Sequence, residues 1–174
     1  MRLLGPSPGP TKLGTGPMRA RSFDEVGSFD DYRPGDRFVT EPIEITEADL
    51  ADYVERHGPV PTDTYWGRDP ERSRQVFPDL AVLCLCFSHL IRSGFLRGHG
   101  MSSPGLEYLR CPEPVLPGDL VRVELECLEA RPSRTRDDRG YATFDVRMVA
   151  ERGAVLVEFR VAEVVARRSH TTSG

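Results

Sequence analysis

The run Leu80–Phe87, LAVLCLCF, constrains the fold of this chain more than any other stretch, because every residue in it is apolar. The run is too short to span a membrane, and it is too uniformly apolar for a surface helix with a single apolar stripe. Pro78 and Asp79 suit a first helical turn, and Gly94 or Gly98 can end the helix. We therefore predict a helix over about 79–96, buried on all sides in its first half and polar only near its end.

The hydrophobic period changes to two after this helix, which predicts strands. After a loop at 97–105, Leu106–Cys111 is predicted as a short strand, followed by three longer strands at Leu120–Ala130, Tyr141–Ala150 and Ala154–Val165. The inward-facing residues predicted for the longer strands are Val121, Val123, Leu125, Cys127, Ala142, Phe144, Val146, Met148, Val155, Val157, Phe159 and Val161.

Two elements are predicted before the apolar helix. Phe38–Ile45 has strand character, but Pro42 makes it an edge or bent strand. Thr46–Asp49 resembles a capping box that opens a short helix ending near His57. A meander with one apolar face must cover that face, and the Leu80 helix is the one partner that is large and apolar enough. The predicted fold class is α+β, with a curved antiparallel sheet wrapped around one long central helix.

Length and composition indicate one domain. We predict a Gly/Pro-rich disordered tail at 1–22, a single domain at 23–166 and a second disordered tail at 167–174, with Met18 as an alternative start to Met1. The net charge of −4, without a basic stripe, argues against nucleic-acid binding. Neither a membrane span nor a secretory segment is present, so we expect a cytoplasmic protein without a membrane partner.

The cysteines favour buried free thiols over a metal site. Cys84, Cys86, Cys111 and Cys127 are the four in the chain, and none of them forms the paired C-x-x-C spacing of a zinc site. We therefore expect no metal and no cofactor.

The loop before the apolar helix, Gly58–Val76, is polar, rich in turn residues and carries the one tryptophan of the chain. A long loop directly before a buried helix is more often functional than idle.

Several short stretches, in order, resemble a known family. They are the segments at 32–38 (YRPGDRF), 45–49 (ITEAD), 107–110 (EYLR), 114–119 (PVLPGD) and 128–133 (LEARPS). In this combination the chain resembles the MaoC-like (R)-specific enoyl-thioester hydratases and dehydratases over Phe29–Val165. The resemblance implies a hot-dog fold, an acyl substrate carried as a thioester on coenzyme A or an acyl-carrier protein, and a homodimer, with a heterodimer as the alternative.

The chain departs from the family pattern where the family's chemistry takes place. The family has an Asp-x-Asn-Pro-x-His loop, and its aspartate and histidine handle the water and the protons. Here Gly58 stands at the place of the aspartate, Val60 at that of the asparagine and Asp63 at that of the histidine. The start of the helix reads Ala81-Val82-Leu83 in place of Ala-His-Gly. The standard dyad is therefore absent or rebuilt from other residues.

Three residues are candidates to replace the dyad. Asp63 could act as general acid or base if it is desolvated, or it could simply cap a turn in solvent. His57 could supply the imidazole, or it could be a helix-terminal histidine favoured by the dipole. Tyr65 could donate a hydrogen bond to a substrate oxygen or pack in the core, and we predict His89 to be a core histidine with its hydrogen bonds satisfied. The predicted substrate-binding residues are Val60, Trp66, Val82, Leu83 (through its backbone N–H, as oxyanion donor) and Cys84.

Three functions follow from these residues. The first is an acyl-thioester hydratase or dehydratase without the standard dyad, or a cyclase that adds an internal hydroxyl to an enoyl thioester, in polyketide or fatty-acyl metabolism. The second is a catalytically silent hot-dog subunit that binds acyl chains or completes an active partner. The third is a thioesterase in which Asp63 directs water at the carbonyl.

Overall fold

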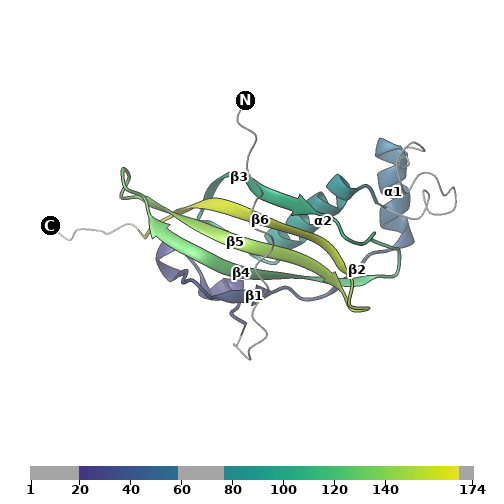
Figure 1. Cartoon of the computed structure of the whole chain (residues 1–174), viewed down its shortest axis with the longest axis horizontal. Coiled ribbons are helices and arrows are strands. Elements are labelled where there is room, and N and C mark those ends of the chain that lie inside the picture. The colour runs from purple at the N-terminus through teal and green to yellow at the C-terminus, as the bar shows by residue number, and fades with distance from the viewer. Residues whose placement is uncertain (1–19, 59–76, 169–174) are drawn as a thin grey trace.

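The structure, a computed structural model, describes residues 20–58 and 77–168. Its main element is a six-stranded antiparallel sheet with the strand order β1-β4-β5-β6-β3, in which β2 also pairs with β4. Two α-helices and two short 3-10 helices complete the described residues (Figure 1). The bounds are η1 Phe23–Glu25, η2 Phe29–Asp31, β1 Arg37–Val39, β2 Ile43–Glu44, α1 Glu47–His57, α2 Asp79–Arg92, β3 Gly100–Arg110, β4 Leu120–Pro132, β5 Arg139–Ala150 and β6 Val155–Ala166.

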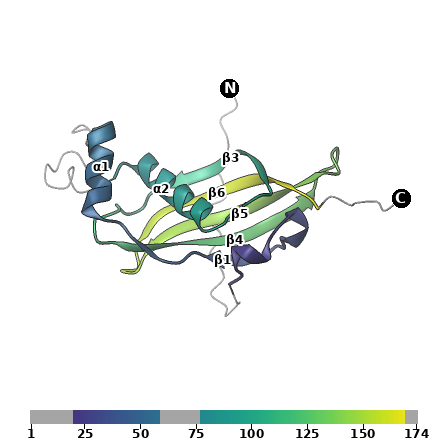
Figure 2. The same ribbon diagram turned by 180° about the vertical axis from the view of Figure 1, so that it is seen from behind.

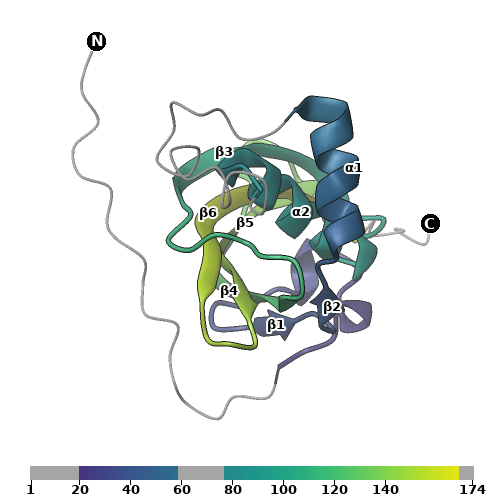
Figure 3. The ribbon, with the colours of Figure 1, turned by 90° about the vertical axis from the view of Figure 1, so that its right-hand side faces the viewer.

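The sheet curves around α2, as the end-on view shows (Figure 3). Burial alternates along β4 as predicted, whereas β5 and β6 also bury residues of their other face, among them Asp145, Arg160 and Val164. All the predicted inward residues of the three strands are buried except the half-buried Val155. Phe87 of α2 stacks on Phe159 of β6 with ring centroids 5.1 Å apart, and Phe95 packs edge-on against Phe144 of β5 at 5.3 Å. The predicted curved sheet around a central helix is therefore confirmed.

Helix α2 is shorter and less buried than predicted. It ends at Arg92, because Gly94 and then Leu96 take positive φ angles of 100° and 58° that an α-helix cannot continue through. Leu80 is 67% exposed and Ile91 is 56% exposed, and Cys84 is exposed between them. These three residues share one helical face. The expectation that the first half of the helix is buried on all sides is wrong, because the sheet covers only one side of it (Figure 2).

Strand β3 begins earlier than predicted. Residues 100–105, which we expected to lie in a loop, pair with β6 as part of β3. The stretch contains Gly100, Pro104 and Gly105 and lacks apolar alternation, and the pairing register shifts on both sides of Ser102. β3 is also an edge strand with mostly exposed side chains, so no burial pattern marks it in the sequence.

The elements before α2 match their predictions. Pro42 separates β1 from β2, and both pair with β4 at the edge of the sheet. Thr46 caps α1: its side chain accepts from the Asp49 N–H, and the Asp49 side chain accepts from the Thr46 N–H. Gly58 ends α1 with φ +82° and donates its N–H to the Val54 carbonyl.

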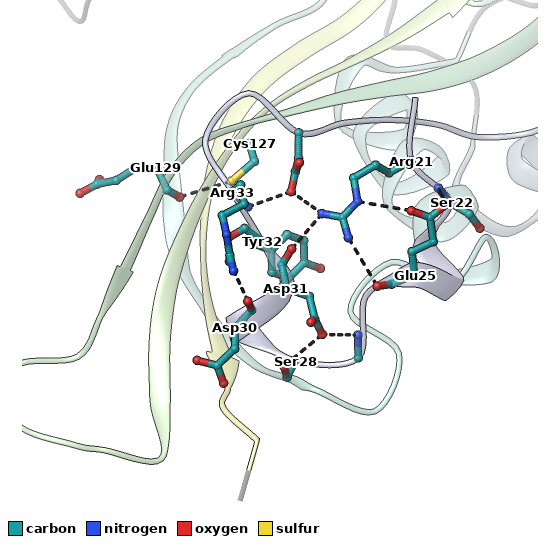
Figure 4. Close-up of polar contacts among 12 residues, drawn as sticks. Arg21, Ser22, Glu25, Ser28, Asp30, Asp31, Tyr32, Arg33, Cys127 and Glu129 are labelled. Atoms are coloured by element: carbon teal, nitrogen blue, oxygen red, sulfur yellow. Dashed lines mark hydrogen bonds and ion pairs between the residues drawn. The ribbon is translucent and has the colours of Figure 1, made fainter. Parts of the chain in front are cut away.

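A polar network fixes the chain before β1 to the sheet (Figure 4). Nη1 of Arg21 donates to the Asp31 carbonyl at 2.8 Å and to Oδ2 of Asp36 at 2.5 Å. Asp30 and Asp31 in turn bind the side chains of Arg167 and Arg168 after β6. Both ends of the described body are thus held together, while the tails predicted at 1–22 and 167–174 lie mostly outside the described residues.

Two classes of feature are not found in the part of the chain that the structure describes. None of its helices is long and apolar enough to cross a membrane. Its histidine, cysteine and carboxylate side chains also form no group of three that could hold a metal ion.

Candidate functional site

The start of α2 presents backbone N–H groups that can stabilise a negative charge. The N–H groups of Ala81 and Val82 both donate to the Pro78 carbonyl, at 2.8 and 3.1 Å. Regular helix geometry leaves the N–H groups of Asp79 and Leu80 without an acceptor inside the helix, at the positive end of its dipole. The N–H of Leu83, the predicted oxyanion donor, lies one turn further in, where the Asp79 carbonyl is its regular acceptor.

The side chains predicted to bind substrate at this end of α2 differ in their exposure. Val82 is in the core with 2% exposed, Leu83 is half-buried against the core, and Cys84 is exposed. Val60, Asp63, Tyr65 and Trp66 lie outside the described residues.

His57 is exposed at the end of α1, and aromatic contacts connect it to the start of α2. Its ring lies 4.8 Å from that of Tyr53, and Tyr53 packs edge-on against Phe77 at 5.7 Å. Phe77 is buried two residues before α2 begins. The contact between Tyr53 and Phe77 therefore brings the last turns of α1 close to the start of α2, and His57 packs on Tyr53 within its own helix.

His89 has the structural role predicted for it. It is buried on α2, and its Nε2 donates to the Glu41 carbonyl at 2.9 Å and lies 2.8 Å from Oγ1 of Thr40. Thr40 Oγ1 also accepts from the Val123 N–H. This network ties α2 to the β1–β4 edge of the sheet and leaves His89 unavailable for chemistry.

A second concave site lies at the other end of α2. The α2–β3 cleft, about 330 Å³ in volume, is bounded by the last turns of α2, the turn after it and the first residues of β3. Its lining residues are Phe87, Ile91, Phe95, Leu96, Gly100, Met101, Ser102, Ser103 and Glu163.

Among the described residues that line the α2–β3 cleft, Glu163 is the one ionisable group. It is only 4% exposed, and burial raises the pKa of its carboxyl to about 7, with the Ser103 hydroxyl opposing part of that shift. A carboxyl that titrates near neutral pH can either donate or accept a hydrogen bond, which is the property that general acid–base groups need.

The hydrophobic period of β6 marks Glu163 in the sequence, although Glu163 is not among the predicted site residues. In β6 the apolar face runs through Val157, Phe159 and Val161, and Glu163 is the next residue of the same period before Val165. A charged residue at an inward strand position breaks the pattern of a core-facing strand. Such breaks concentrate at functional or strained sites.

Tyr32 and His99 form a buried pair close to Glu163. The Tyr32 hydroxyl lies 3.2 Å from Nε2 of His99, and Nδ1 of His99 donates to the Arg97 carbonyl at 2.8 Å. Burial lowers the pKa of His99, so the imidazole is neutral with its proton on Nδ1, and Tyr32 donates to Nε2. Burial is the main cause that raises the pKa of Tyr32, with smaller contributions from Cys127 and Glu163. The pair is satisfied and neutral.

The cysteines are all free thiols, and three of them are poor nucleophiles. Burial raises the pKa of Cys111 to about 11 and that of Cys127 to about 12, and it also raises the pKa of Cys86. Cys86 and Cys127 are buried as predicted, whereas Cys111 is half-buried and Cys84 is exposed, so the prediction of buried thiols is wrong for Cys84.

Comparison with known proteins gives structural likenesses only. No family model and no curated protein sequence matches the chain. Among solved structures, the chain is similar to a MaoC-like dehydratase from Rhodospirillum rubrum, with 25% identity, a TM-score of 0.68, and coverage of 82% of this chain and 99% of that one.

Two other likenesses agree with this one. An R-hydratase from Pseudomonas aeruginosa is 21% identical, with a TM-score of 0.56 and coverage of 81% of this chain and 86% of that one. A conserved hypothetical protein from Mycobacterium tuberculosis with a double hot-dog fold is 12% identical, with a TM-score of 0.66, and the match covers 87% of this chain and 47% of that one. The sheet wrapped around α2, together with these likenesses, shows a hot-dog fold like that of the MaoC-like dehydratase and the R-hydratase.

Proposed function

We propose that this protein is an enzyme that acts on an acyl thioester of coenzyme A or of an acyl-carrier protein, without the standard Asp/His dyad. Its reaction is hydration or dehydration, or the related cyclisation in which a tethered hydroxyl replaces water. The observation that carries the proposal is the likeness to the R. rubrum MaoC-like dehydratase over 99% of that protein.

The start of α2 supports the proposal through its backbone. These reactions pass through an enolate, whose oxygen needs hydrogen-bond donors. The Asp79 and Leu80 N–H groups lie at the positive end of α2 and are not used within the helix. The exposed Leu80 side chain next to them offers an apolar contact for an acyl chain.

Acid–base groups for the reaction come, in this proposal, from the segment that precedes α2. His57 packs on Tyr53 of its own helix, and Tyr53 contacts Phe77 just before α2; Asp63 and Tyr65 are the candidates that the sequence offers from the loop. Cyclisation requires positioning of the internal hydroxyl more than activation of water, so it tolerates the loss of the dyad better than hydration does.

The test is to incubate the purified protein with enoyl and 3-hydroxyacyl thioesters and to identify the products by mass spectrometry, with a thiol assay to detect hydrolysis. His57→Ala and Asp63→Asn should each lower kcat/KM by about 10²-fold or more. Arg56→Ala, at the exposed neighbouring position of α1, is the matched control and should leave turnover unchanged. Turnover that neither His57→Ala nor Asp63→Asn affects would show that the residue assignment is wrong.

One observation favours the silent subunit as the second candidate. Gly58 stands at the place of the family's aspartate and has φ +82°, a conformation that strains other residues, so an aspartate cannot be restored there without cost. Val82, at the place of the histidine in Ala-His-Gly, is 2% exposed in the core. If the pure protein converts no thioester but activity appears when a dyad-bearing hot-dog protein co-purifies with it, the silent subunit is correct.

We also propose that the protein forms a homodimer through β3. This strand is an edge of the sheet and pairs only with β6 among the described strands, so one row of its backbone groups is left to pair with another chain. Leu106 is 40% exposed on this strand.

A further inference from the structure

The α2–β3 cleft combines apolar walls with a single carboxyl group. The walls come from α2 and the turn that follows it, with Phe87, Ile91, Phe95 and Leu96, while Glu163 enters from β6. Glutamate is almost never this deeply buried unless it is paired with a cation. Here the burial itself requires an explanation.

No cation stabilises Glu163 among the described residues. The influences on its pKa are burial, which raises it, and the hydrogen bond to Ser103, which lowers it. In the segment before β1, the ionisable neighbour of Glu163 is Tyr32. Its hydroxyl is neutral and is hydrogen-bonded to the neutral His99. Phe87, Ile91 and the facing parts of β3 add no charge. Glu163 therefore has hydrogen-bonding capacity that the protein itself leaves largely unused.

The chemistry of the cleft selects a narrow class of ligand. The apolar walls favour an aliphatic chain. A free carboxylate or phosphate would be repelled by the ionised form of Glu163 and would have no cation to bind. A neutral oxygen group fits both forms: ionised Glu163 accepts a hydrogen bond from a hydroxyl, and protonated Glu163 donates one to a hydroxyl or a carbonyl.

The exposed face of α2 connects this cleft to the start of the helix. Leu80, Cys84 and Ile91 lie along it, and the rise of an α-helix separates the first from the last by about 16 Å. A long acyl chain held by its thioester at the start of α2 can reach the cleft along this face.

We propose that the α2–β3 cleft receives the far end of the acyl chain and that Glu163 hydrogen-bonds a hydroxyl or carbonyl oxygen carried there. The identity of the ligand as an acyl chain rests on the proposed function. The site itself rests on the cleft and its buried carboxyl.

The experiment uses unreactive thioether analogues of acyl-pantetheine, so it does not require turnover. Chains of graded length end in a methyl group, a hydroxyl or a methyl ketone, and their affinities for the whole protein are measured by calorimetry. Methyl signals of Met101 and Ile91 in NMR spectra report whether the chain end occupies the cleft. We expect the hydroxyl analogue to bind about tenfold more tightly than the methyl analogue, the value of one net hydrogen bond.

Affinity measured against pH distinguishes the two oxygen groups. The ketone only accepts hydrogen bonds, so its advantage should disappear as the pH rises from about 6 to about 8.5 and Glu163 loses its proton. The hydroxyl should keep its advantage, because ionised Glu163 still accepts from it.

Three variants complete the test. Glu163→Gln should keep the preference for oxygen at both pH values, and Glu163→Leu should bind the methyl analogue at least as well as the wild type while losing the preference. Glu158→Gln, on the opposite face of β6, is the matched control and should behave as the wild type. Thermal unfolding confirms that each variant is folded.

Failure of this inference can be told apart from failure of the proposed function. If thioesters are not converted but the hydroxyl analogue is preferred in a Glu163-dependent way, the proposed function fails and the site stands. If the analogues do not bind, bind without moving the Met101 and Ile91 signals, or bind the Glu163→Leu variant with the same preference, the inference is overturned even if thioesters are converted.

Discussion

At the scale of single residues, Glu163 should make stability fall as the pH rises. Its carboxyl has a pKa of about 7 in the folded protein, against an ordinary pKa of 4.5 in the unfolded chain. Between these values the folded state binds more protons than the unfolded state, so the free energy of unfolding decreases as the pH rises. The cost is absent below about pH 4.5 and complete above about pH 7.

We expect Glu163→Gln to be more stable than the wild type at about pH 8.5 by an order of 2 kcal/mol, and by clearly less at about pH 5. Urea unfolding of both proteins at the two pH values measures this. A constant difference between them would mean that the pKa of Glu163 is not raised by folding. Glu158→Gln again serves as the control.

Gly140 of β5 is required by a close approach. A methyl group added at Gly140 would lie 2.4 Å from ring carbons of Phe29, which is buried and held within η2. Gly140→Ala should therefore lower the free energy of unfolding by about 1–3 kcal/mol, as overpacking does. Gly27→Ala, where the added methyl has no neighbour within 4 Å and φ is not positive, should change it little in the same urea titration.

At the scale of elements, the inward faces of β4, β5 and β6 could be read from the sequence, because apolar residues recur there with a period of two. The capping box of α1 could be read because Thr46 and Asp49 act within one turn. Strand β3 could not, because an exposed edge strand with Pro104 and two glycines carries no burial pattern. The same reasoning missed the exposed face of α2, since apolar residues alone do not say which of them the sheet will cover.

The candidate site was harder to predict than the fold. The family resemblance predicts a site in the segment before α2, and the loss of the dyad is visible in the sequence at Gly58 and Asp63. The α2–β3 cleft brings β6, β3 and α2 together from distant parts of the chain, so its existence depends on tertiary structure. The sign of this cleft in the sequence is the position of Glu163 on the inward-facing side of β6.

The cap of α1 gives a prediction for that element. Replacing Thr46 by Ala removes the acceptor for the Asp49 N–H and should lower the free energy of unfolding by about 1 kcal/mol. Ser88→Ala, at an exposed position within α2, should have little effect. Equal losses in the two variants, measured by urea unfolding, would show that the cap is not the cause.

At the scale of the whole molecule, the two edges of the sheet differ. One edge is formed by the short strands β1 and β2, separated by Pro42, and the other by β3 along its whole length. Long edge strands are the ones prone to pair with another chain. The proposed homodimer should therefore depend on β3 and not on β1.

Leu106→Asp on β3 should shift the protein from dimer to monomer in light scattering after size exclusion. Val39→Asp on β1, where the native side chain is 43% exposed against 40% for Leu106, should leave the dimer intact. A monomeric wild type, or a dimer that only Val39→Asp dissociates, would contradict the assignment of the interface to β3.

The difference between the two edges also limits how far assembly can proceed. A sheet with two long open edges can add a copy on each side and grow into a ribbon without end. Among the described strands, the interruption at Pro42 leaves β3 as the one long open edge. Two copies that meet through β3, related by a two-fold axis, use up this edge in both. Interrupting one edge strand is thus sufficient to turn a surface that could polymerise into one that closes after a single partner.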